Sequence, residues 1–149
     1  MLVTARTEDI EVDNIVCVSD IKKGLGPIMG MYTGLSNISN ERVVVNPVDT
    51  PNVTEKLLLY MVEISNGYDI VMPRRGNNLE PLISVYSKNV IPIIERTLND
   101  GLKPAPHLLV KDGNGLKVRI LEDSELKNFG NPEILFQNIN APEDLKKQK

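Results

Sequence analysis

Tryptophan is absent from this 149-residue sequence, and cysteine and histidine occur only once each. The single cysteine, Cys17, excludes an internal disulfide, and its place in the apolar run of residues 15–18 predicts a small buried hydrophobic residue. The single histidine, His107, has no cysteine or carboxylate at the spacing of a zinc-ligand set. This argues against a zinc site, and we expect His107 to pack at the surface or in the core.

Long apolar runs and clustered basic residues are also missing. No stretch reaches the about 20 apolar residues that a membrane-spanning helix needs, and the first residues lack the basic and then apolar layout of a signal peptide. The formal net charge is −3, and no long basic run exists outside residues 146–149. A nucleic-acid-binding surface would require positive charge gathered on one face. We therefore expect a cytoplasmic protein whose partners are neither nucleic acids nor membranes.

The composition that is present is that of an ordinary globular protein, with 41% hydrophobic and 25% charged residues. A chain of this length forms one domain and buries about two thirds of the surface that its unfolded form would expose. Strand-like and helix-like segments alternate along it, which favours βαβ units. We predict one α/β domain over residues 1–149, with a mostly parallel sheet.

The apolar periodicity predicts where the elements lie. Strands are expected at residues 2–4, 14–18, 42–47, 69–73, 79–86, 117–121 and 134–137, and helices after residues 24–30, over 55–66 and 89–100, and from residue 142. The near-continuous apolar run of residues 42–47 predicts a strand near the sheet centre, buried on both faces. Residues 79–86 follow a polar turn at residues 74–78 and could run antiparallel. Thr54 is placed to cap the helix that follows it.

The strand at residues 42–47 leads directly into Asp49, which is followed by Thr50 and Pro51. A carboxylate at the carboxyl end of a strand stands where open α/β sheets bind their ligands. Mg²⁺ prefers carboxylate oxygens together with substrate phosphates and water, so one aspartate suffices as its protein anchor. The same residues also form turns for purely conformational reasons, because aspartate and proline are turn formers. Both interpretations stay open on these residues alone.

Further candidate binding groups flank this strand in sequence. The glycine-rich residues 24–30 precede a predicted helix, whose amides and dipole favour a phosphate, but they match neither a Walker loop nor a dinucleotide fingerprint. Taken alone, a tight turn explains them better. Asn138 and Asn140 alternate, so both amides could hold one polar ligand, or they could end a strand and cap the last helix. Arg74 and Arg75 could contact a phosphate, although paired arginines in a polar turn are more often solvated.

Four motifs in this order resemble those of the molybdenum cofactor guanylyltransferases, a family of the nucleotidyltransferase superfamily. Its members carry Gly-Pro-hydrophobic-small-Gly, a strand ending in Pro-x-Asp-x-Pro, Glu-Pro-Leu leading a strand, and Asn-x-Asn-Thr-Pro-Glu-Asp-Leu near the end. Here these stand as Gly26-Pro27-Ile28-Met29-Gly30, Pro47-Val48-Asp49-Thr50-Pro51, Glu80-Pro81-Leu82 and Asn138-Ile139-Asn140-Ala141-Pro142-Glu143-Asp144-Leu145. Four motifs in the right order are far more specific than any one of them.

The resemblance implies a three-layer αβα, Rossmann-like fold of the nucleotide-diphospho-sugar transferase type. It implies transfer of GMP from GTP to molybdopterin with Mg²⁺. By the same resemblance, Asp49 is the catalytic residue, the metal ligand and a contact of the triphosphate. The remaining implied contacts are Asp20, Gly26, Pro27 and Gly30 on the nucleotide, and Asn138 and Asn140 on the molybdopterin side.

The sequence departs from the family's pattern in two places. Ala141 stands where threonine is usual, which removes a helix cap worth about 0.5–2 kcal/mol. Family members also begin with a strand and a loop of the type Leu-Ala-Gly-Gly…Arg-Met-Gly…Asp-Lys, which wraps the triphosphate, and nothing like it precedes Met1. That strand belongs in the middle of the sheet, so we expect a domain that is incomplete at its N-terminus, with unpaired strand edges that a homo-oligomer could cover.

Three functions follow from these observations. The first is a guanylyltransferase of molybdenum cofactor biosynthesis, and the second is another nucleotidyltransferase, such as a cytidylyltransferase. The third is a non-catalytic binding or oligomerising domain that keeps the later half of the fold. The choice of guanine over cytosine rests on the resemblance alone.

Overall fold

The computed structural model describes residues 2–4, 16–102, 105–111 and 113–139. Its strands are β1 (Leu2–Thr4), β2 (Cys17–Ser19), β3 (Arg42–Val45), β4 (Ile70–Arg75), β5 (Asn78–Leu79), β6 (Ser84–Ser87) and β7 (Val118–Leu121). Its helices are α1 (Pro27–Asn37), α2 (Glu55–Glu63), α3 (Ile91–Asn99), α4 (Asp123–Leu126) and α5 (Pro132–Leu135), with short 3₁₀ helices η1 (Lys88–Val90) and η2 (Pro106–Val110). Within these residues, no helix is both long and apolar enough to cross a membrane.

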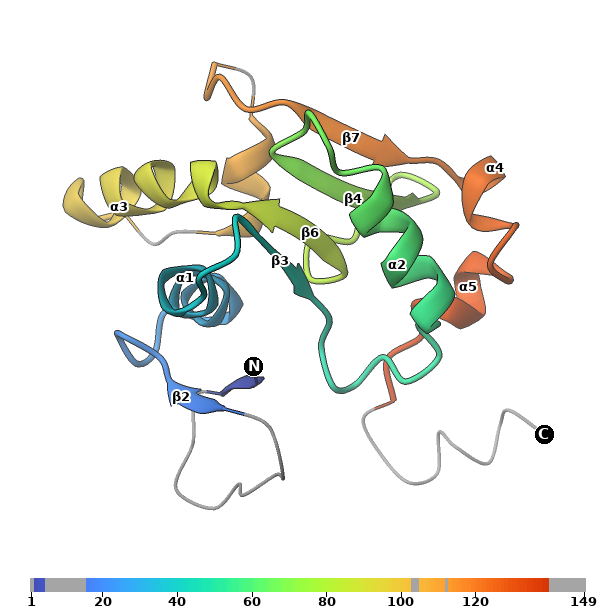
Figure 1. The fold of residues 1–149 in the computed structure, drawn as a ribbon, viewed down its shortest axis with the longest axis horizontal. Coiled ribbons are helices and arrows are strands. Elements are labelled where there is room, and N and C mark those ends of the chain that lie inside the picture. The colour runs from blue at the N-terminus through green and yellow to red at the C-terminus, as the bar shows by residue number, and fades with distance from the viewer. Residues whose placement is uncertain (1, 5–15, 103–104, 112, 140–149) are drawn as a thin grey trace.

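The strands form two sheets (Figure 1). In the smaller sheet β1 pairs in parallel with β2, whereas the larger sheet has the order β3-β6-β4-β5, with β7 also paired to β4. Strand β6 runs antiparallel to both β3 and β4, and β7 runs parallel to β4, so that β3, β4 and β7 share one direction. The predicted α/β class and the antiparallel return near residues 79–86 are confirmed.

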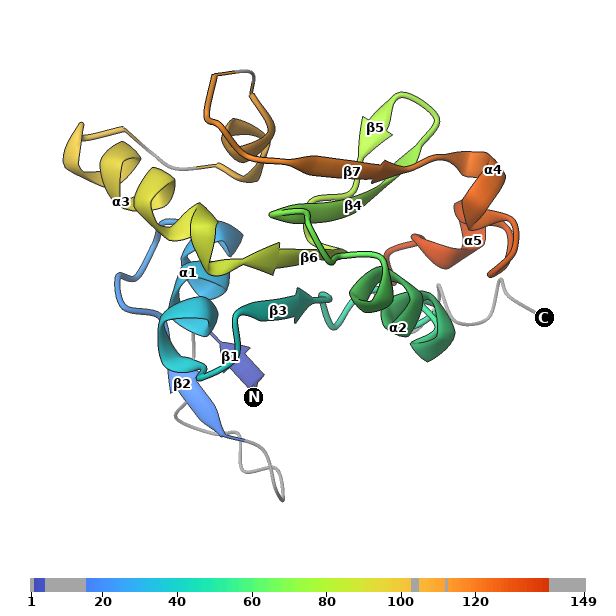
Figure 2. The same ribbon diagram turned by 45° about the horizontal axis from the view of Figure 1, so that its top comes forward.

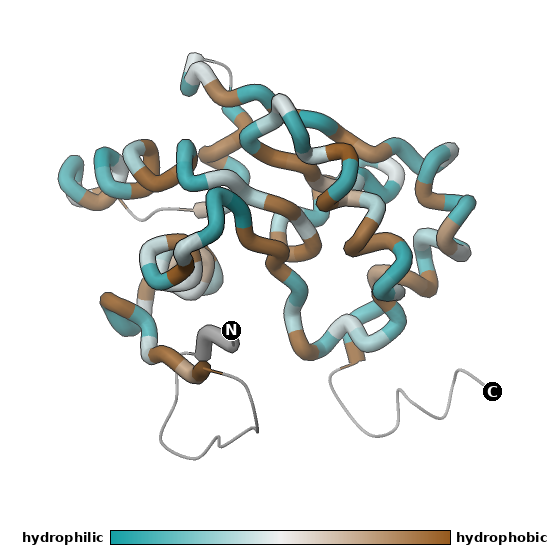
Figure 3. The backbone as a smooth tube through the Cα atoms, in the orientation of Figure 1, coloured by the Kyte–Doolittle hydropathy of each residue, from teal (hydrophilic) through white to brown (hydrophobic). Residues whose placement is uncertain are grey.

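Alternating side chains of the larger sheet build two cores, one on each face. Ile70 and Met72 point to the core that contains α1 and α3, whereas Val71, between them, belongs to the core that contains α2, α4 and α5. The helices lie correspondingly on the two sides of this sheet (Figures 1 and 2), and the apolar stretches gather along the strands and the inner helix faces (Figure 3). The expected three-layer arrangement is therefore present.

Strand β3 lies at one end of the larger sheet rather than near its centre. Val43 and Val45 pack against the first core, but the side chain of Val44 is 38% exposed, so the expected burial on both faces is wrong. Helix α2 packs over β6, and the second face of β3, which carries Val44, stays partly exposed. Among the described residues, β3 and β1 each have one edge without a partner strand, and α1 packs against β1, β2 and β3.

Local signals predicted several elements well. Strand β1 coincides with the predicted residues 2–4, and β7 with most of residues 117–121. The hydroxyl oxygen of Thr54 accepts a 3.3 Å hydrogen bond from the backbone N–H of Leu57, so the predicted cap of α2 is confirmed. The predicted strand at residues 14–18 is confirmed for its described part as β2, and the predicted helix from residue 142 lies outside the described residues.

Two predicted elements are wrong. Residues 134–137 were expected to form a strand, but α5 spans Pro132–Leu135, because the side chain of Asn131 accepts a hydrogen bond from the N–H of Glu133 and Pro132 opens the first turn. Arg74 and Arg75 lie in β4 rather than in a turn, since the chain reverses later, at Gly76 with φ 56°.

Candidate functional site

Asp49 lies in the loop at the carboxyl end of β3. This loop does form a turn, but the turn is made by other groups: the Thr50 N–H and hydroxyl both donate to the carbonyl oxygen of Pro47, at 3.4 and 3.0 Å, and the Val53 N–H donates to the carbonyl of Thr50 at 3.2 Å. The carboxylate oxygen Oδ1 of Asp49 is buried and has no hydrogen-bond partner among the described residues. A buried carboxylate oxygen without a partner is costly, and a bound cation would offset that cost.

The C-terminal segment reaches the same loop. The backbone N–H of Ile139 donates a 2.7 Å hydrogen bond to the carbonyl oxygen of Asp49. This contact brings Asn138, the neighbour of Ile139 in sequence, to the loop that carries Asp49. The structure therefore unites two of the four motifs, whereas Asn140 lies outside the described residues.

Asp20 follows β2 at the smaller sheet and has a similar carboxylate. Its Oδ1 is buried and unpartnered among the described residues, and burial raises the pKa of this group above its ordinary value of 3.8. The backbone N–H of the next residue, Ile21, donates a 3.0 Å hydrogen bond to the hydroxyl oxygen of Thr33 in α1. Asp20 is thereby fixed beside α1, the helix that the glycine-rich segment opens.

The N-terminus of α1 is shaped by glycine. Gly26 precedes the helix with φ 77°, a left-handed conformation that other residues adopt only with strain, and Pro27 occupies the first turn. A Cβ atom at Gly26 would meet nothing within 4 Å, so its conformation and not a close approach requires the glycine. The first turn, which also includes Gly30 at its end, has no acidic side chain. Its positive dipole end is therefore not neutralised by the helix itself.

A multidentate protein metal site is not built into the described part of the chain, in which no three His, Cys, Asp or Glu side chains could share one ion. An Mg²⁺ ion does not require one, because it takes one or two carboxylates and completes its shell with substrate phosphates and water. The unpartnered oxygen of Asp49 fits such an anchor. The candidate residues thus form two groups, with Asp20 and the start of α1 at the smaller sheet and Asp49 with Asn138 at the larger one.

Arg75 shows what sequence reasoning missed. Its guanidinium binds Glu80 at 3.0 Å and Glu133 at 3.4 Å, so it links the Glu-Pro-Leu motif to α5. Arg74 forms an ion pair with Glu122 at 3.1 Å. Both arginines therefore contact carboxylates, and neither is simply solvated. No spacing in the sequence indicated these pairs, because the strand that carries the arginines was expected to be a turn.

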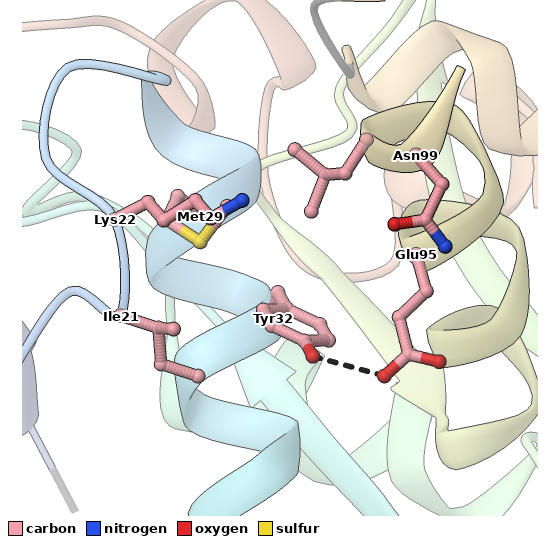
Figure 4. Close-up of a pocket in the computed structure, with 7 residues that line it drawn as sticks. Ile21, Lys22, Met29, Tyr32, Glu95 and Asn99 are labelled. Atoms are coloured by element: carbon pink, nitrogen blue, oxygen red, sulfur yellow. Dashed lines mark hydrogen bonds between the residues drawn. The ribbon is translucent and has the colours of Figure 1, made fainter. Parts of the chain in front are cut away.

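Two cavities in the described part of the chain have neither Asp20 nor Asn138 in their walls. One, of about 270 Å³, lies between α1 and α3 and is lined by Ile21, Lys22, Met29, Tyr32, Glu95, Leu98 and Asn99 (Figure 4). The Tyr32 hydroxyl donates a 2.9 Å hydrogen bond to Glu95 across it, which raises the pKa of Tyr32. The other, of about 290 Å³, has the exposed His107 in its wall. Asp49 lines neither cavity.

Comparison with known proteins gives the family. The family model described as "MobA-like NTP transferase domain" matches residues 1–111 of this chain. The chain therefore belongs to the MobA-like NTP transferase family. The resemblance inferred from the four motifs is confirmed.

Relatives of this MobA-like chain agree with that assignment. A probable molybdenum cofactor guanylyltransferase from Pelotomaculum thermopropionicum is 35% identical over 89% of the chain and 62% of its own length. The crystal structure of molybdopterin-guanine dinucleotide biosynthesis protein A from Archaeoglobus fulgidus matches with a TM-score of 0.70 and 27% identity, over 88% of the chain and 65% of its own. The chain thus spans less than two thirds of the length of both relatives.

A third comparison concerns the fold alone. The cytidylyltransferase acting on 2-C-methyl-D-erythritol 4-phosphate from Thermus thermophilus matches with a TM-score of 0.64 but only 16% identity, over 95% of the chain and 76% of its own. This likeness confirms that the described strands and helices follow a nucleotidyltransferase fold.

Proposed function

We propose that this chain acts in molybdenum cofactor biosynthesis as a guanylyltransferase that transfers GMP from GTP to molybdopterin. The observation that carries the proposal is the buried, unpartnered carboxylate oxygen of Asp49, which lies at the carboxyl end of β3 and beside the segment of Asn138. The similarity to a probable molybdenum cofactor guanylyltransferase and to a molybdopterin-guanine dinucleotide biosynthesis protein supports the choice of substrates.

In the proposed reaction, a phosphate oxygen of molybdopterin attacks the α-phosphorus of GTP. A bond forms between that oxygen and phosphorus, and the bond from the α-phosphorus to the bridging oxygen breaks, so that pyrophosphate leaves with the electron pair. Bound Mg²⁺ supplies neutralisation of the charge on the phosphates. Asp49 would hold the ion and, through it, the triphosphate, and Asn138 and Asn140 would face the molybdopterin.

The proposed nucleotide contacts come from the end of β2 and from the start of α1. Asp20 accepts hydrogen bonds from the nucleotide, and Gly26, Pro27 and Gly30 present the start of α1 to it, where the dipole favours negative charge. Asp20 suits this role because its buried oxygen lacks a partner among the described residues. We place the protein in the cytoplasm, where GTP is available.

The free edges of β1 and β3 favour a second component of the proposal. Unpaired edges are templates for pairing with another chain, so we propose that the protein forms a homo-oligomer that covers them. If the chain proves to bind no nucleotide, this assembly becomes its function, as an oligomerising or binding domain of the same fold.

Calorimetric titration with GTP, CTP and ATP in the presence of Mg²⁺ tests the proposal. We expect heat from GTP that disappears when Mg²⁺ is removed with a chelator. A preference for CTP would replace the guanylyltransferase with a cytidylyltransferase, which the fold also accommodates. Flat heats for all three nucleotides would overturn the nucleotidyltransferase proposal for this chain.

A further inference from the structure

The loop that carries Asp49 is held partly by packing, since Thr50 is 2% exposed and Val53 contacts the second core, and partly by hydrogen bonds to the segment around α5. Its internal hydrogen bonds, among Pro47, Thr50 and Val53, give the turn its shape but do not fix its position. Among the described residues, two further hydrogen bonds join the loop to α5 and to the segment after it. The side-chain amide of Asn52 donates to the carbonyl oxygen of Ile134 at 3.1 Å, and the carbonyl oxygen of Asp49 accepts from the Ile139 N–H at 2.7 Å.

The segment on the other side of these two bonds is firmly held. Leu135 and Phe136 are 4% and 2% exposed and pack in the second core. Asn131 caps the start of α5, and Glu133 in its first turn forms an ion pair with Arg75 of β4 at 3.4 Å. The carbonyl of Ile134 therefore belongs to a packed element, and Asn52 connects the turn to that element through a single side chain.

We propose that Asn52 is a positioning residue, which sets the Asp49 carboxylate for its ligand by tying the loop to α5. Asn52 lies outside all four sequence motifs, directly after Pro51. Its amide hydrogen bond is exposed, so the bond holds the loop in place while the buried side chains of α5 hold the fold. Groups outside the ligand shell orient ligand-bearing side chains, and their loss typically lowers metal affinity about 10–100-fold. The identity of the ligand depends on the function proposed above, whereas the hydrogen bond between Asn52 and Ile134 does not.

The test compares the full chain with three variants. Asn52→Leu keeps the branching and the number of heavy atoms of the side chain and removes the donor. Asn52→Gln keeps a donor on a longer stem, and Asn66→Leu is a matched change at an exposed asparagine after α2. Two quantities are measured. The first is hydrogen exchange of the Thr50, Val53 and Ile139 amides in the metal-free protein, and the second is the affinity for Mn²⁺ in the presence of GTP, followed by electron paramagnetic resonance.

For Asn52→Leu we expect faster exchange at these amides and Mn²⁺ affinity lowered about tenfold or more, with a melting temperature equal to that of Asn66→Leu. Asn52→Gln should restore part of both quantities. The proposal is overturned if exchange and affinity in Asn52→Leu equal those of the unmodified chain, or if they change only together with a lower melting temperature. If the unmodified chain binds no Mn²⁺ with GTP, the proposed function fails, and the exchange measurement alone decides whether Asn52 positions the loop.

Discussion

The carboxylate of Asp69 accepts a 2.8 Å hydrogen bond from the backbone N–H of Lys117, 48 residues further along the chain. The same carboxylate accepts from the side chains of Asn89 at 2.6 Å and Ser87 at 3.2 Å. Asp69 therefore joins the start of β4 to the approach to β7 and to the end of β6. Burial alone would raise its pKa, but these hydrogen bonds outweigh burial and lower the pKa below the ordinary value of 3.8.

Replacing Asp69 with alanine should destabilise the protein, because three donors lose their acceptor. We expect a loss of about 1–2 kcal/mol at neutral pH, since the carboxylate is partly exposed. A lowered pKa contributes stability above the unfolded-state pKa and loses it as the pH falls, so the deficit should shrink below pH 3.8. Urea unfolding at several pH values measures it, with Asp100→Ala, at an exposed aspartate, as the control. An equal loss in both variants would contradict the role of Asp69.

Asp20→Asn should behave in the opposite way. Burial raises the pKa of Asp20, so its charged form costs stability at neutral pH, and that cost vanishes as the carboxyl becomes protonated. The variant should therefore be more stable than the unmodified chain at neutral pH and equally stable below pH 3.8. Its affinity for GTP should fall, because the proposed acceptor is lost. Unfolding curves at several pH values check the stability, and a titration with GTP checks the affinity. A lower stability of the variant at neutral pH would refute the predicted stabilisation.

Asp49→Asn separates chemistry from folding. It removes the charge that the proposed cation needs and keeps the size of the side chain, so Mg²⁺-dependent nucleotidyl transfer should fall by at least about 100-fold. Stability should stay the same or rise, because the buried Oδ1 atom of Asp49 gains nothing from a protein partner. Release of pyrophosphate measures the activity, and Asp100→Asn is the control. Activity close to that of the unmodified chain would rule out Asp49 as the metal anchor.

The open edge of β3 predicts an assembly that depends on concentration. Light scattering after size-exclusion chromatography should show a dimer or larger species that dissociates on dilution. Val44→Lys places a charge on this edge strand and should shift the protein to the monomer, whereas Leu59→Lys, at an exposed position of α2, should not. A monomer at all concentrations would contradict the proposed homo-oligomer.

The sequence predicted those parts of the fold that local signals determine. The helix after residues 24–30 and the cap at Thr54 follow from signals within a few residues, and the structure has both. The place of β3 could not be predicted in this way, because its burial depends on which distant strands and helices cover it. The apolar run at residues 134–137 is too short to distinguish a strand from a helix, although Asn131 and Pro132 before it were a readable helix start.

The candidate site also has residues that local signals indicate and residues that depend on distant contacts. Asp49 was found because a strand end and a turn lie next to each other in sequence. The structure brings it close to the segment of Asn138, which belongs to another of the four motifs. Asn52 was missed because its partner is a backbone carbonyl 82 residues away, which no residue pattern reveals. Arg75 was missed for a related reason, since its second carboxylate lies 58 residues further on.

The position of α1 has a consequence for how the molecule opens. Because this helix packs against β1 and β2 as well as β3, it couples a two-stranded unit to a far more extensively packed one. The backbone amides of such unequally packed units exchange their hydrogens with solvent at unequal rates. The smaller unit should therefore unfold locally while the rest of the protein stays native. Each such opening would move Asp20 away from its neighbours and leave Asp49 in place. The affinity for the nucleotide would then depend more strongly on temperature than the affinity for the metal ion.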